Sequence, residues 1–166
     1  MKRDLQYISH ESLKPFIYPE AEMLILGSLP SVKSREENFY YAHKSNRFYK
    51  VLAGIYEEDT PNTTEEKKAF LKKHHIALYD SIYSCYIRGS SDASIKNITP
   101  SDIKSLIKNT NIKKIFTTGK LAYKVYREYI ENDVGIKAIS LPSTSSANAT
   151  ISLEKLIEEY RLITTK

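Results

Sequence analysis

Met23-Leu24-Ile25-Leu26-Gly27 is a short apolar run that ends at a glycine, the pattern of a strand buried inside a sheet. Three more runs of this kind follow, at residues 76–84, 112–118 and 136–141. Helix patterns separate the runs, and strands joined through helices form right-handed crossovers that place the strands parallel. The sequence therefore predicts an α/β fold with three layers, α/β/α, and a central four-stranded, mainly parallel sheet covered on both faces.

Capping residues mark the helices expected between and after these strands. Thr63 and Glu66 have the spacing of a capping box. Thr99-Pro100-Ser101-Asp102 combines a hydroxyl N-cap, a proline at the first helical position and an acid in the first turn. The predicted helices run from an N-cap at Ser45 to about Tyr56, from Thr63 to about His74, from Thr99 to about Asn109, from Gly119 to about Glu131, and from Ser152 to Ile163.

Polar loops leave three of the four predicted strands, and they give the first indication of a functional site. They cover residues 28–45, 85–97 and 141–150. In open α/β sheets, ligands bind in the crevice beyond the carboxyl ends of the strands. We therefore expect the site to lie where these loops leave the sheet.

The composition describes one globular domain. The chain has 166 residues, of which 41% are hydrophobic, and a chain of this length buries roughly 70% of its unfolded surface. Cys85 is the only cysteine, which excludes a disulfide framework and is typical of a reducing compartment. No stretch approaches the length of a transmembrane helix, and no apolar segment follows the charged N-terminus. We therefore expect a single domain over residues 1–166, located in the cytoplasm and without a membrane partner.

Positive charge is concentrated in two segments of the chain. The net charge is +5, but residues 31–50 carry +3 and residues 101–130 carry +5, so the remaining residues sum to −3. This concentration favours a polyanion as partner, because the local field governs steering and counterion release. Each lysine taken alone is better explained as part of a solvated helix face.

Two of the loops carry motifs of a known family. Residues 27–31, Gly-Ser-Leu-Pro-Ser, and then residues 39–49, Phe-Tyr-Tyr-Ala-His-Lys-Ser-Asn-Arg-Phe-Tyr, resemble the first motif region of the uracil-DNA glycosylase superfamily. Residues 141–149, Leu-Pro-Ser-Thr-Ser-Ser-Ala-Asn-Ala, resemble its second motif. The combination, together with residues 78–97, is most similar to the hypoxanthine-DNA glycosylase (DNA-deoxyinosine glycosylase) branch. The resemblance implies a uracil-DNA glycosylase-like fold and an enzyme of DNA repair.

The resemblance implies that Asn46 is the catalytic residue. A glycosylase must extrude a nucleotide, hold its base and stabilise an oxocarbenium-like sugar while water attacks. The amide of Asn46 can orient this water with its carbonyl or hold the leaving purine with its NH2 group. Leu29 stands where most branches carry Asp or Asn, and leucine can neither activate nor position water. Without the resemblance, Asn46 is better explained as a residue at a helix terminus.

The resemblance also assigns a base-binding set. Tyr41 matches the aromatic residue that stacks on the flipped base in related branches, and the alternative is an ordinary surface or core tyrosine. The backbone amides of Ser28 and Leu29 are expected to bind base carbonyls, and His43 a base or a phosphate. The full set is Gly27, Ser28, Leu29, Pro30, Tyr41 and His43.

The second motif implies contacts with the DNA backbone. Its hydroxyl groups and N–H groups can reach phosphates, and residues 146–148 are expected to enter the gap left by the flipped nucleotide. The alternative is a flexible polar turn. The loop consists of Ser143, Thr144, Ser145, Ser146, Ala147 and Asn148, and a further phosphate contact is expected from Thr118, Gly119 and Lys120.

The sequence predicts neither a cofactor nor a metal site. His74 and His75 are adjacent and therefore point in different directions, and no phosphate-binding glycine loop is present. Asp80 and Asp92 are acids close to the predicted site loops, and Asp80 is expected at most to assist water or to hold a lysine. No lysine occupies a position that the family would use as a Schiff-base nucleophile, which implies a monofunctional enzyme that leaves an abasic site.

The leading hypothesis is a monomeric glycosylase that acts on double-stranded DNA containing a deaminated base, most of all hypoxanthine, with uracil or xanthine as further substrates. Two alternatives remain open at this point. A catalytically inactive nucleic-acid-binding module on the same fold would explain Leu29. An α/β enzyme for a small phosphorylated metabolite would use the same Ser/Thr loops.

Overall fold

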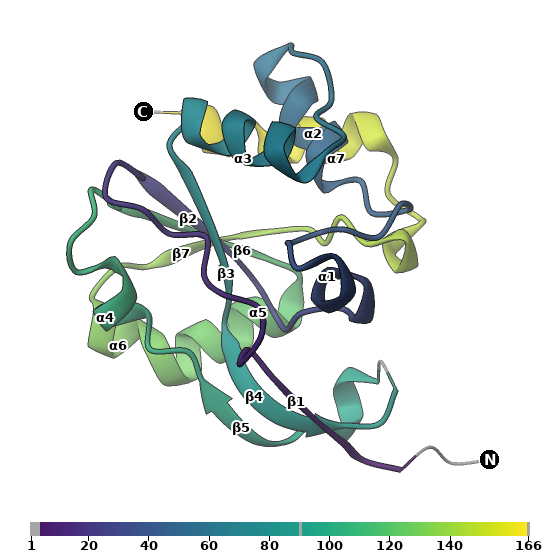
Figure 1. The fold of residues 1–166 in the computed structure, drawn as a ribbon, viewed down its shortest axis with the longest axis vertical. Helices are drawn as coiled ribbons and strands as arrows, with labels where there is room; N and C mark the ends of the chain where they lie inside the picture. The colour runs from purple at the N-terminus through teal and green to yellow at the C-terminus, as the bar shows by residue number, and fades with distance from the viewer. Residues whose placement is uncertain (1–3, 90, 166) are drawn as a thin grey trace.

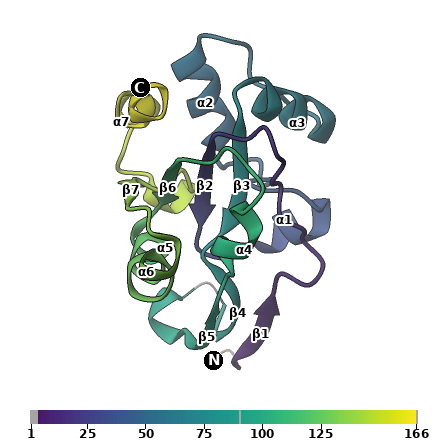
Figure 2. The same ribbon diagram turned by 90° about the vertical axis from the view of Figure 1, so that its left-hand side faces the viewer.

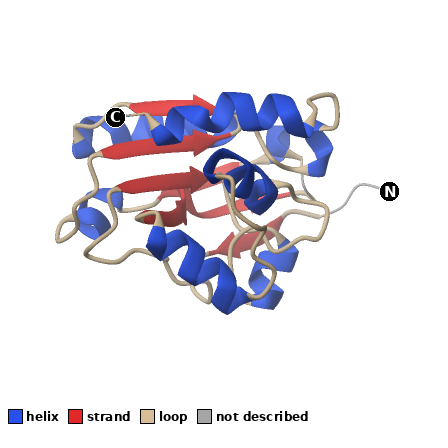
Figure 3. Cartoon of the chain, turned by 90° about the horizontal axis from the view of Figure 1, so that it is seen from above, coloured by secondary structure: helices blue, strands red, loops and turns tan. Residues whose placement is uncertain are grey.

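The computed structural model describes residues 4–89 and 91–165 and contains the predicted parallel sheet (Figure 1). Its four strands lie in the order β3-β2-β6-β7, and every neighbouring pair is parallel. Figure 3 shows these strands side by side, pointing in one direction. The strands are β2 (Met23–Gly27), β3 (Ile76–Asp80), β6 (Lys114–Thr118) and β7 (Ala138–Leu141). The predicted fold class is therefore confirmed.

Helices cover both faces of this sheet, as Figures 1 and 2 show. On one face lie α2 (Phe48–Tyr56), α3 (Thr64–Lys73) and α7 (Leu153–Tyr160). A short 3-10 turn, Arg161–Thr164, follows α7. On the other lie α4 (Ile103–Ile107), α5 (Lys120–Val125) and α6 (Glu131–Val134), the last two joined by a π-helical turn, Tyr126–Ile130. No helix of the described residues is long and apolar enough to cross a membrane.

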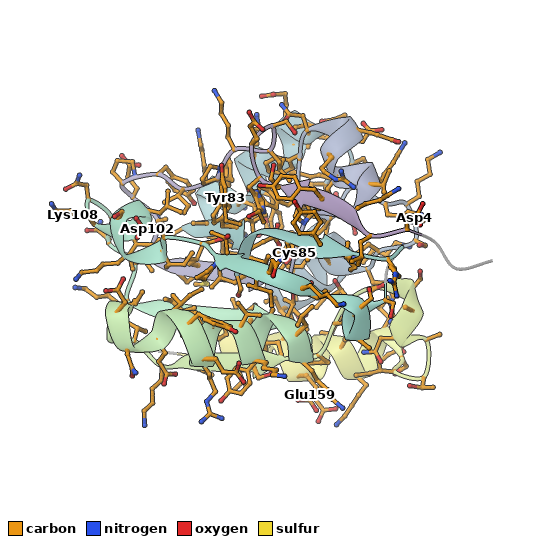
Figure 4. All side chains as sticks on the ribbon, turned by 90° about the horizontal axis from the view of Figure 1, so that it is seen from below. Asp4, Tyr83, Cys85, Asp102, Lys108 and Glu159 are labelled. Atoms are coloured by element: carbon orange, nitrogen blue, oxygen red, sulfur yellow. The ribbon has the colours of Figure 1, made fainter. Side chains whose placement is uncertain are left out.

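A second sheet is the largest departure from the predicted elements. It is antiparallel, in the order β1-β4-β5, with β1 (Gln6–Ser9), β4 (Ile82–Ile87) and β5 (Lys96–Pro100). The strand predicted at residues 76–84 is thus two strands, which separate at Ser81, where the backbone N–H donates to the carbonyl of Gly27 (2.8 Å). Figure 4, seen from below, places Tyr83 and Cys85 on β4. The prediction of a loop over residues 85–97 is wrong at both of its ends.

Two predicted helix starts are also wrong. Thr99 and Pro100 end the edge strand β5, where a proline costs no ladder hydrogen bond, and Asp102 caps α4 instead. Ser45 does not cap α2, which begins after Arg47. A short helix, α1 (Val32–Glu37), lies inside the loop predicted for residues 28–45. The caps at Thr63 and Ser152 are confirmed, but the capping box is not complete, because the Glu66 carboxylate accepts from the N–H of Asn62 (3.3 Å) instead of that of Thr63.

The interior consists of two apolar clusters. The larger one fills the space around the parallel sheet and includes Phe48, Phe116 and Tyr126, each with no exposed surface. The smaller one lies between the second sheet and α5, and contains Ile82 and Cys85. Leu29 packs against this smaller cluster, so its apolar side chain connects the exit of β2 to the second sheet.

Candidate functional site

A cavity of about 290 Å³ opens at the carboxyl ends of β2, β3 and β6, where the sequence places the site. We call it the strand-end cavity. In Figure 1 the chain leaves β2 into α1 on the same side as the segment that precedes α7. The residues that line the cavity are Gly27, Ser28, Leu29, Pro30, Ser31, Ser34, Tyr40, Tyr41, His43, Ser45, Asn46, Asp80, Thr118, Ser143, Thr144, Ser145 and Ser146.

The cavity brings together the predicted catalytic residue Asn46 and all six predicted base-binding residues. Four residues of the second motif, numbers 143–146, also line it. Ala147 and Asn148 instead line an adjoining groove of about 670 Å³, together with Gly119 and Lys120. Of the described residues in the predicted loop 85–97, only Asp92 lines this groove, and the two ends of that segment belong to strands of the second sheet.

Asn46 has a fixed side-chain orientation. Its Oδ1 accepts hydrogen bonds from the backbone N–H of Phe48 (2.9 Å) and from the hydroxyl of Thr144 (2.8 Å). Since both partners donate, the carbonyl end of the amide faces them and is occupied. The interpretation of Asn46 as a helix-terminus residue is therefore correct for Oδ1. The NH2 group is the part of this side chain that is left for a ligand.

Arg47 connects the two motif loops, a role that the sequence analysis did not identify. Its guanidinium donates to the carbonyls of Ile151 (2.7 Å) and Asn148 (3.1 Å), and its backbone N–H donates to the carbonyl of Thr144 (3.0 Å). The planar fork of arginine serves two acceptors at once, which suits this position. A basic residue beside a polar motif gave no signal that its charge would be used inside the protein.

Replacing Arg47 with lysine is expected to lower the free energy of unfolding by about 1–3 kcal/mol, because one of the two carbonyls then loses its donor. Chemical denaturation measures the change. Arg127→Lys is the matched control, since Arg127 is exposed, and it should shift stability by no more than about 0.5 kcal/mol. Equal stability of Arg47→Lys and the unmodified protein would contradict the connecting role.

Tyr41 lies in the cavity wall with a strained backbone. Its φ is +56°, in the left-handed region that a bulky side chain rarely adopts and that costs of order 1–3 kcal/mol. Its ring stacks on Phe48 with 3.8 Å between centroids, and its hydroxyl lies 3.3 Å from Oγ1 of Thr118. Burial, and then the nearby charge of Asp80, raises the pKa of the Tyr41 phenol far above its usual value of 10. The hydroxyl therefore stays protonated.

Two neighbouring tyrosines, Tyr40 and Tyr49, bond to backbone carbonyls near this wall. Tyr40 is buried and donates to the carbonyl of Lys14 (2.8 Å). Tyr49 is also buried and donates to the carbonyl of Tyr40 (2.8 Å). Both hydroxyl groups are thus used inside the protein.

Ser45 and His43 lie at the exposed rim of the cavity. The Nδ1 atom of His43 lies 2.7 Å from Oγ of Ser45, and Ser45 donates onward to Oγ of Ser146 (3.0 Å). This chain of polar contacts joins the first motif loop to the second across the mouth of the cavity.

The second motif loop is folded by its own hydrogen bonds. Oγ of Ser143 accepts from the N–H of Ser145 (3.1 Å), Oγ of Ser145 accepts from the N–H of Ala147 (3.2 Å), and the amide of Asn148 donates to the carbonyl of Ser143 (3.1 Å). A flexible turn is thus not what the structure shows. Ser146 and Ala147 are the exposed tip, and both side chains are small.

The junction after β6 is mostly occupied by internal contacts. The N–H of Gly119 donates to the carbonyl of Leu141 (2.8 Å), and Thr118 contacts Tyr41. The N–H of Gly119 is therefore used inside the protein, and the phosphate contact expected at residues 118–120 stays a prediction. Lys120 is exposed and lines the groove, so a phosphate contact from its ammonium group stays a prediction.

Asp80 contributes more to the cavity than its sequence context indicated. It ends β3, is 4% exposed, and pairs with Nε2 of the buried His10 through Oδ2 (2.8 Å). A Cβ atom built on Gly27 would lie 2.5 Å from Oδ1 of Asp80 and 3.3 Å from the Tyr41 hydroxyl. Glycine at position 27 is what lets the carboxylate and the tyrosine approach the end of β2.

His10 is the buried partner of the cavity residue Asp80, and the sequence analysis did not identify this pair. It follows β1 and has no motif around it, and only the second sheet brings it next to Asp80. Its other ring nitrogen, Nδ1, lies 2.9 Å from the carbonyl of Leu13. Within the described residues, no three His, Cys, Asp or Glu side chains are grouped so that they could hold a metal ion.

Comparisons with known proteins agree with this geometry. The family model described as the uracil DNA glycosylase superfamily matches residues 15–161. A protein of Methanosarcina barkeri named hypoxanthine DNA glycosylase is 30% identical over 141 residues, covering 83% of this chain and 87% of the relative. One of the same name from Methanosarcina acetivorans is 31% identical over 133 residues, covering 79% and 83%.

A solved structure with a similar fold points to the same family. The solution NMR structure of a candidate uracil DNA glycosylase from Methanosarcina acetivorans superposes with a TM-score of 0.77 at 25% identity, and the match covers 95% of this chain and all of that one. The overall fold of this chain is therefore shared with that structure. The chain belongs to the uracil-DNA glycosylase superfamily.

Proposed function

We propose that this protein extrudes a deaminated base from double-stranded DNA and hydrolyses its N-glycosidic bond, with hypoxanthine as the main substrate and uracil and xanthine as further ones. Family membership supports the DNA N-glycosylase chemistry, and the names of the two Methanosarcina relatives support the choice of hypoxanthine. The observation that carries the proposal is the occupied carbonyl of Asn46, which leaves an amide NH2 as its donor for a ligand in the cavity.

The shape of the cavity suits one flipped base. Its volume of about 290 Å³ lies at the lower end of the range for small-molecule pockets. Phe48 covers one face of the Tyr41 ring, so the base stacks on the other face. The rigid support of Tyr41 means that little ordering is needed when the base enters.

In this proposal, Asn46 promotes the reaction by stabilising the purine leaving group. As the glycosidic bond breaks, negative charge develops on the purine, and the NH2 of Asn46 donates a hydrogen bond to it. Because Oδ1 already accepts two hydrogen bonds, we favour this role over the alternative in which the carbonyl orients the water. Leu29 is explained without a catalytic role, since it packs against the second apolar cluster.

The product is expected to be an abasic site in an uncut strand. A bifunctional glycosylase attacks with an amine, and none of the described residues that line the cavity is a lysine. The test is base release from duplexes containing hypoxanthine, uracil or xanthine, followed by alkaline cleavage at the abasic site. Strand cutting without alkali would contradict a monofunctional mechanism. Duplex binding without release of any base would favour the inactive module.

Replacing Lys120 with alanine is expected to weaken binding to all duplex sequences by a similar factor, and to reduce the slope of log K against log salt by about 1. The reason is that an exposed ammonium group in the groove contacts a phosphate and carries no base information. Lys137→Ala is the matched control. Lys137 is exposed and precedes the amino end of β7, whereas Lys120 follows the carboxyl end of β6. An unchanged slope for Lys120→Ala would contradict a contact between this residue and a phosphate.

A further inference from the structure

A second groove, of about 410 Å³, adjoins the strand-end cavity on the side of α2 and α3. We call it the lysine groove, after Lys33, Lys44, Lys50 and Lys67, which line it together with residues of the segment before α3. Tyr41, His43 and Asn46 line both the groove and the strand-end cavity. The two spaces are therefore continuous, and a nucleotide whose base occupies the cavity has the groove beside its sugar.

Positive charge dominates the lysine groove. Its charged side chains are the four lysines and Glu37, so they sum to +3. Nζ of Lys33 lies 3.0 Å from Oε1 of Glu37, which uses the single acid. Within the described residues, no carboxylate lies within 4 Å of the ammonium groups of Lys44, Lys50 and Lys67. Three positive charges that face one groove without partners indicate an anionic ligand.

Lys67 is the member of this set that a solvated helix face does not explain. Its side chain is partly buried, and Nζ lies 4.7 Å from the centre of the Tyr49 ring. Burial lowers the pKa of this ammonium group, although the charge of Glu37 opposes the shift. A charge that is withdrawn from water is stabilised when an anion approaches it. An anion in the groove would therefore complete the surroundings of Lys67.

The other two openings at this end of the sheet offer much less positive charge. Among the described residues, Asp80 is the only Asp, Glu, Lys or Arg that lines the strand-end cavity. The groove beside the second motif has one charge of each sign, Lys120 and Asp92. Figure 2 shows α1 and α3 on the side of β3 and α5 on the side of β7, so the two grooves lie on opposite sides of the cavity.

A flipped nucleotide is joined to a phosphate on each side of its sugar, so the strand leaves the cavity in two directions. We propose that the lysine groove binds the phosphates of the DNA strand on one side of the flipped nucleotide, and that it supplies more of the electrostatic binding than the groove beside the second motif. On that other side, neutral hydroxyl and N–H groups position the strand. This inference rests on the proposed function.

The test is the salt dependence of duplex binding in a double variant, Lys50→Gln with Lys67→Met. Both changes remove a charge, and methionine keeps an apolar stem on the Tyr49 ring. The slope of log K against log salt should fall by about 2, that is by about one for each lost phosphate contact. Lys72→Gln with Lys108→Gln is the matched control, because both lysines are exposed and line neither groove. It removes the same net charge and should leave the slope unchanged.

Truncated duplexes test the position of the contact. Removing the duplex arm on one side of the lesion should abolish the difference in affinity between the double variant and the unmodified protein, and removing the other arm should preserve it. Lys120→Ala should show the opposite pattern, because its groove lies on the other side of the cavity. Differences that are the same for both truncated duplexes would overturn the one-sided placement.

Two further results would overturn the inference. One is an equal slope for the double variant and the unmodified protein, or an equal loss in the control pair. The other is a site for a small free anion, in which inorganic phosphate binds the unmodified protein and not the double variant while their DNA slopes are equal. Binding is measured on undamaged and on hypoxanthine duplexes, so it does not depend on base release. Failure of the proposed function is a different result, namely that the unmodified protein releases none of the deaminated bases.

Discussion

Replacing Asn46 with alanine is expected to slow the single-turnover release of hypoxanthine by about 100- to 1000-fold, the usual effect of removing one donor that is oriented toward developing charge. The donor is the NH2 group, because Oδ1 is already bonded to Phe48 and Thr144. The measurement is the rate of base release at saturating enzyme. A folded Asn46→Ala protein with the full rate would contradict both the catalytic role of Asn46 and the proposed function.

Asn46→Asp is the matched control for this prediction. The carboxylate keeps an acceptor for Phe48 and Thr144, so the start of α2 and the contact between the loops are retained. It replaces the donor with a negative oxygen, which repels the leaving purine. We therefore expect Asn46→Asp to lose as much activity as Asn46→Ala. Retained activity in Asn46→Asp would instead favour activation of the water.

The two variants should differ in stability, which separates catalysis from folding. Asn46→Ala leaves the N–H of Phe48 without its acceptor, and the loss of such a cap costs about 0.5–2 kcal/mol. Asn46→Asp avoids that cost. Equal activities with unequal unfolding free energies would show that the lost rate does not come from a damaged helix start.

The parallel sheet could be predicted because its four strands are continuous apolar runs between helix patterns. The second sheet could not, because the run from Ile76 resumes at Ile82 after only two polar residues, Asp80 and Ser81, and periodicity alone cannot show that the chain changes sheet there. The bend at Ser81 depends on a hydrogen bond to Gly27, a tertiary contact more than 50 residues away. The helix signal at Pro100 was overridden in the same way, by pairing of β5 with β4.

The candidate site was predictable to the extent that it consists of motif loops. Asn46, Tyr41 and residues 143–146 lie in one cavity, because strand ends and loops meet where the topology requires. His10 was not predictable, since its partner is 70 residues away and its position depends on the second sheet. Arg47 was visible as a charge but not as a connection, because its acceptors are backbone carbonyls, which leave no trace in the sequence.

Leu29 shows how the two sheets explain one departure from the family motif. An Asp or Asn at this position would place a polar group against the second apolar cluster. Burying such a group without partners is costly. In this chain, Asp80 at the end of β3 supplies a polar side chain to the cavity instead, and it is paired with His10, which follows β1 of the second sheet.

Replacing Gly27 with alanine is expected to slow hypoxanthine release by about 100-fold, because displacements near 1 Å at a reacting site have effects of this size. The new Cβ would lie 2.5 Å from Oδ1 of Asp80 and 3.3 Å from the Tyr41 hydroxyl, so the carboxylate must move. Asp80 cannot turn freely, since Oδ2 is held by His10. The overpacking should also cost about 1–3 kcal/mol of stability.

Gly54→Ala provides a steric control at the same nominal distance. Its Cβ would lie 2.5 Å from Cδ1 of Ile157, the end of an aliphatic side chain that can rotate away, and Gly54 lies in α2 outside the strand-end cavity. The rate of base release should therefore stay within about twofold of the unmodified protein, with a stability change of at most about 1–2 kcal/mol. If Gly27→Ala kept the full rate as well, the close approach of Asp80 to the end of β2 would have no part in the reaction. A large loss in Gly27→Ala alone would show that the glycine is needed for the space it leaves to Asp80 and Tyr41.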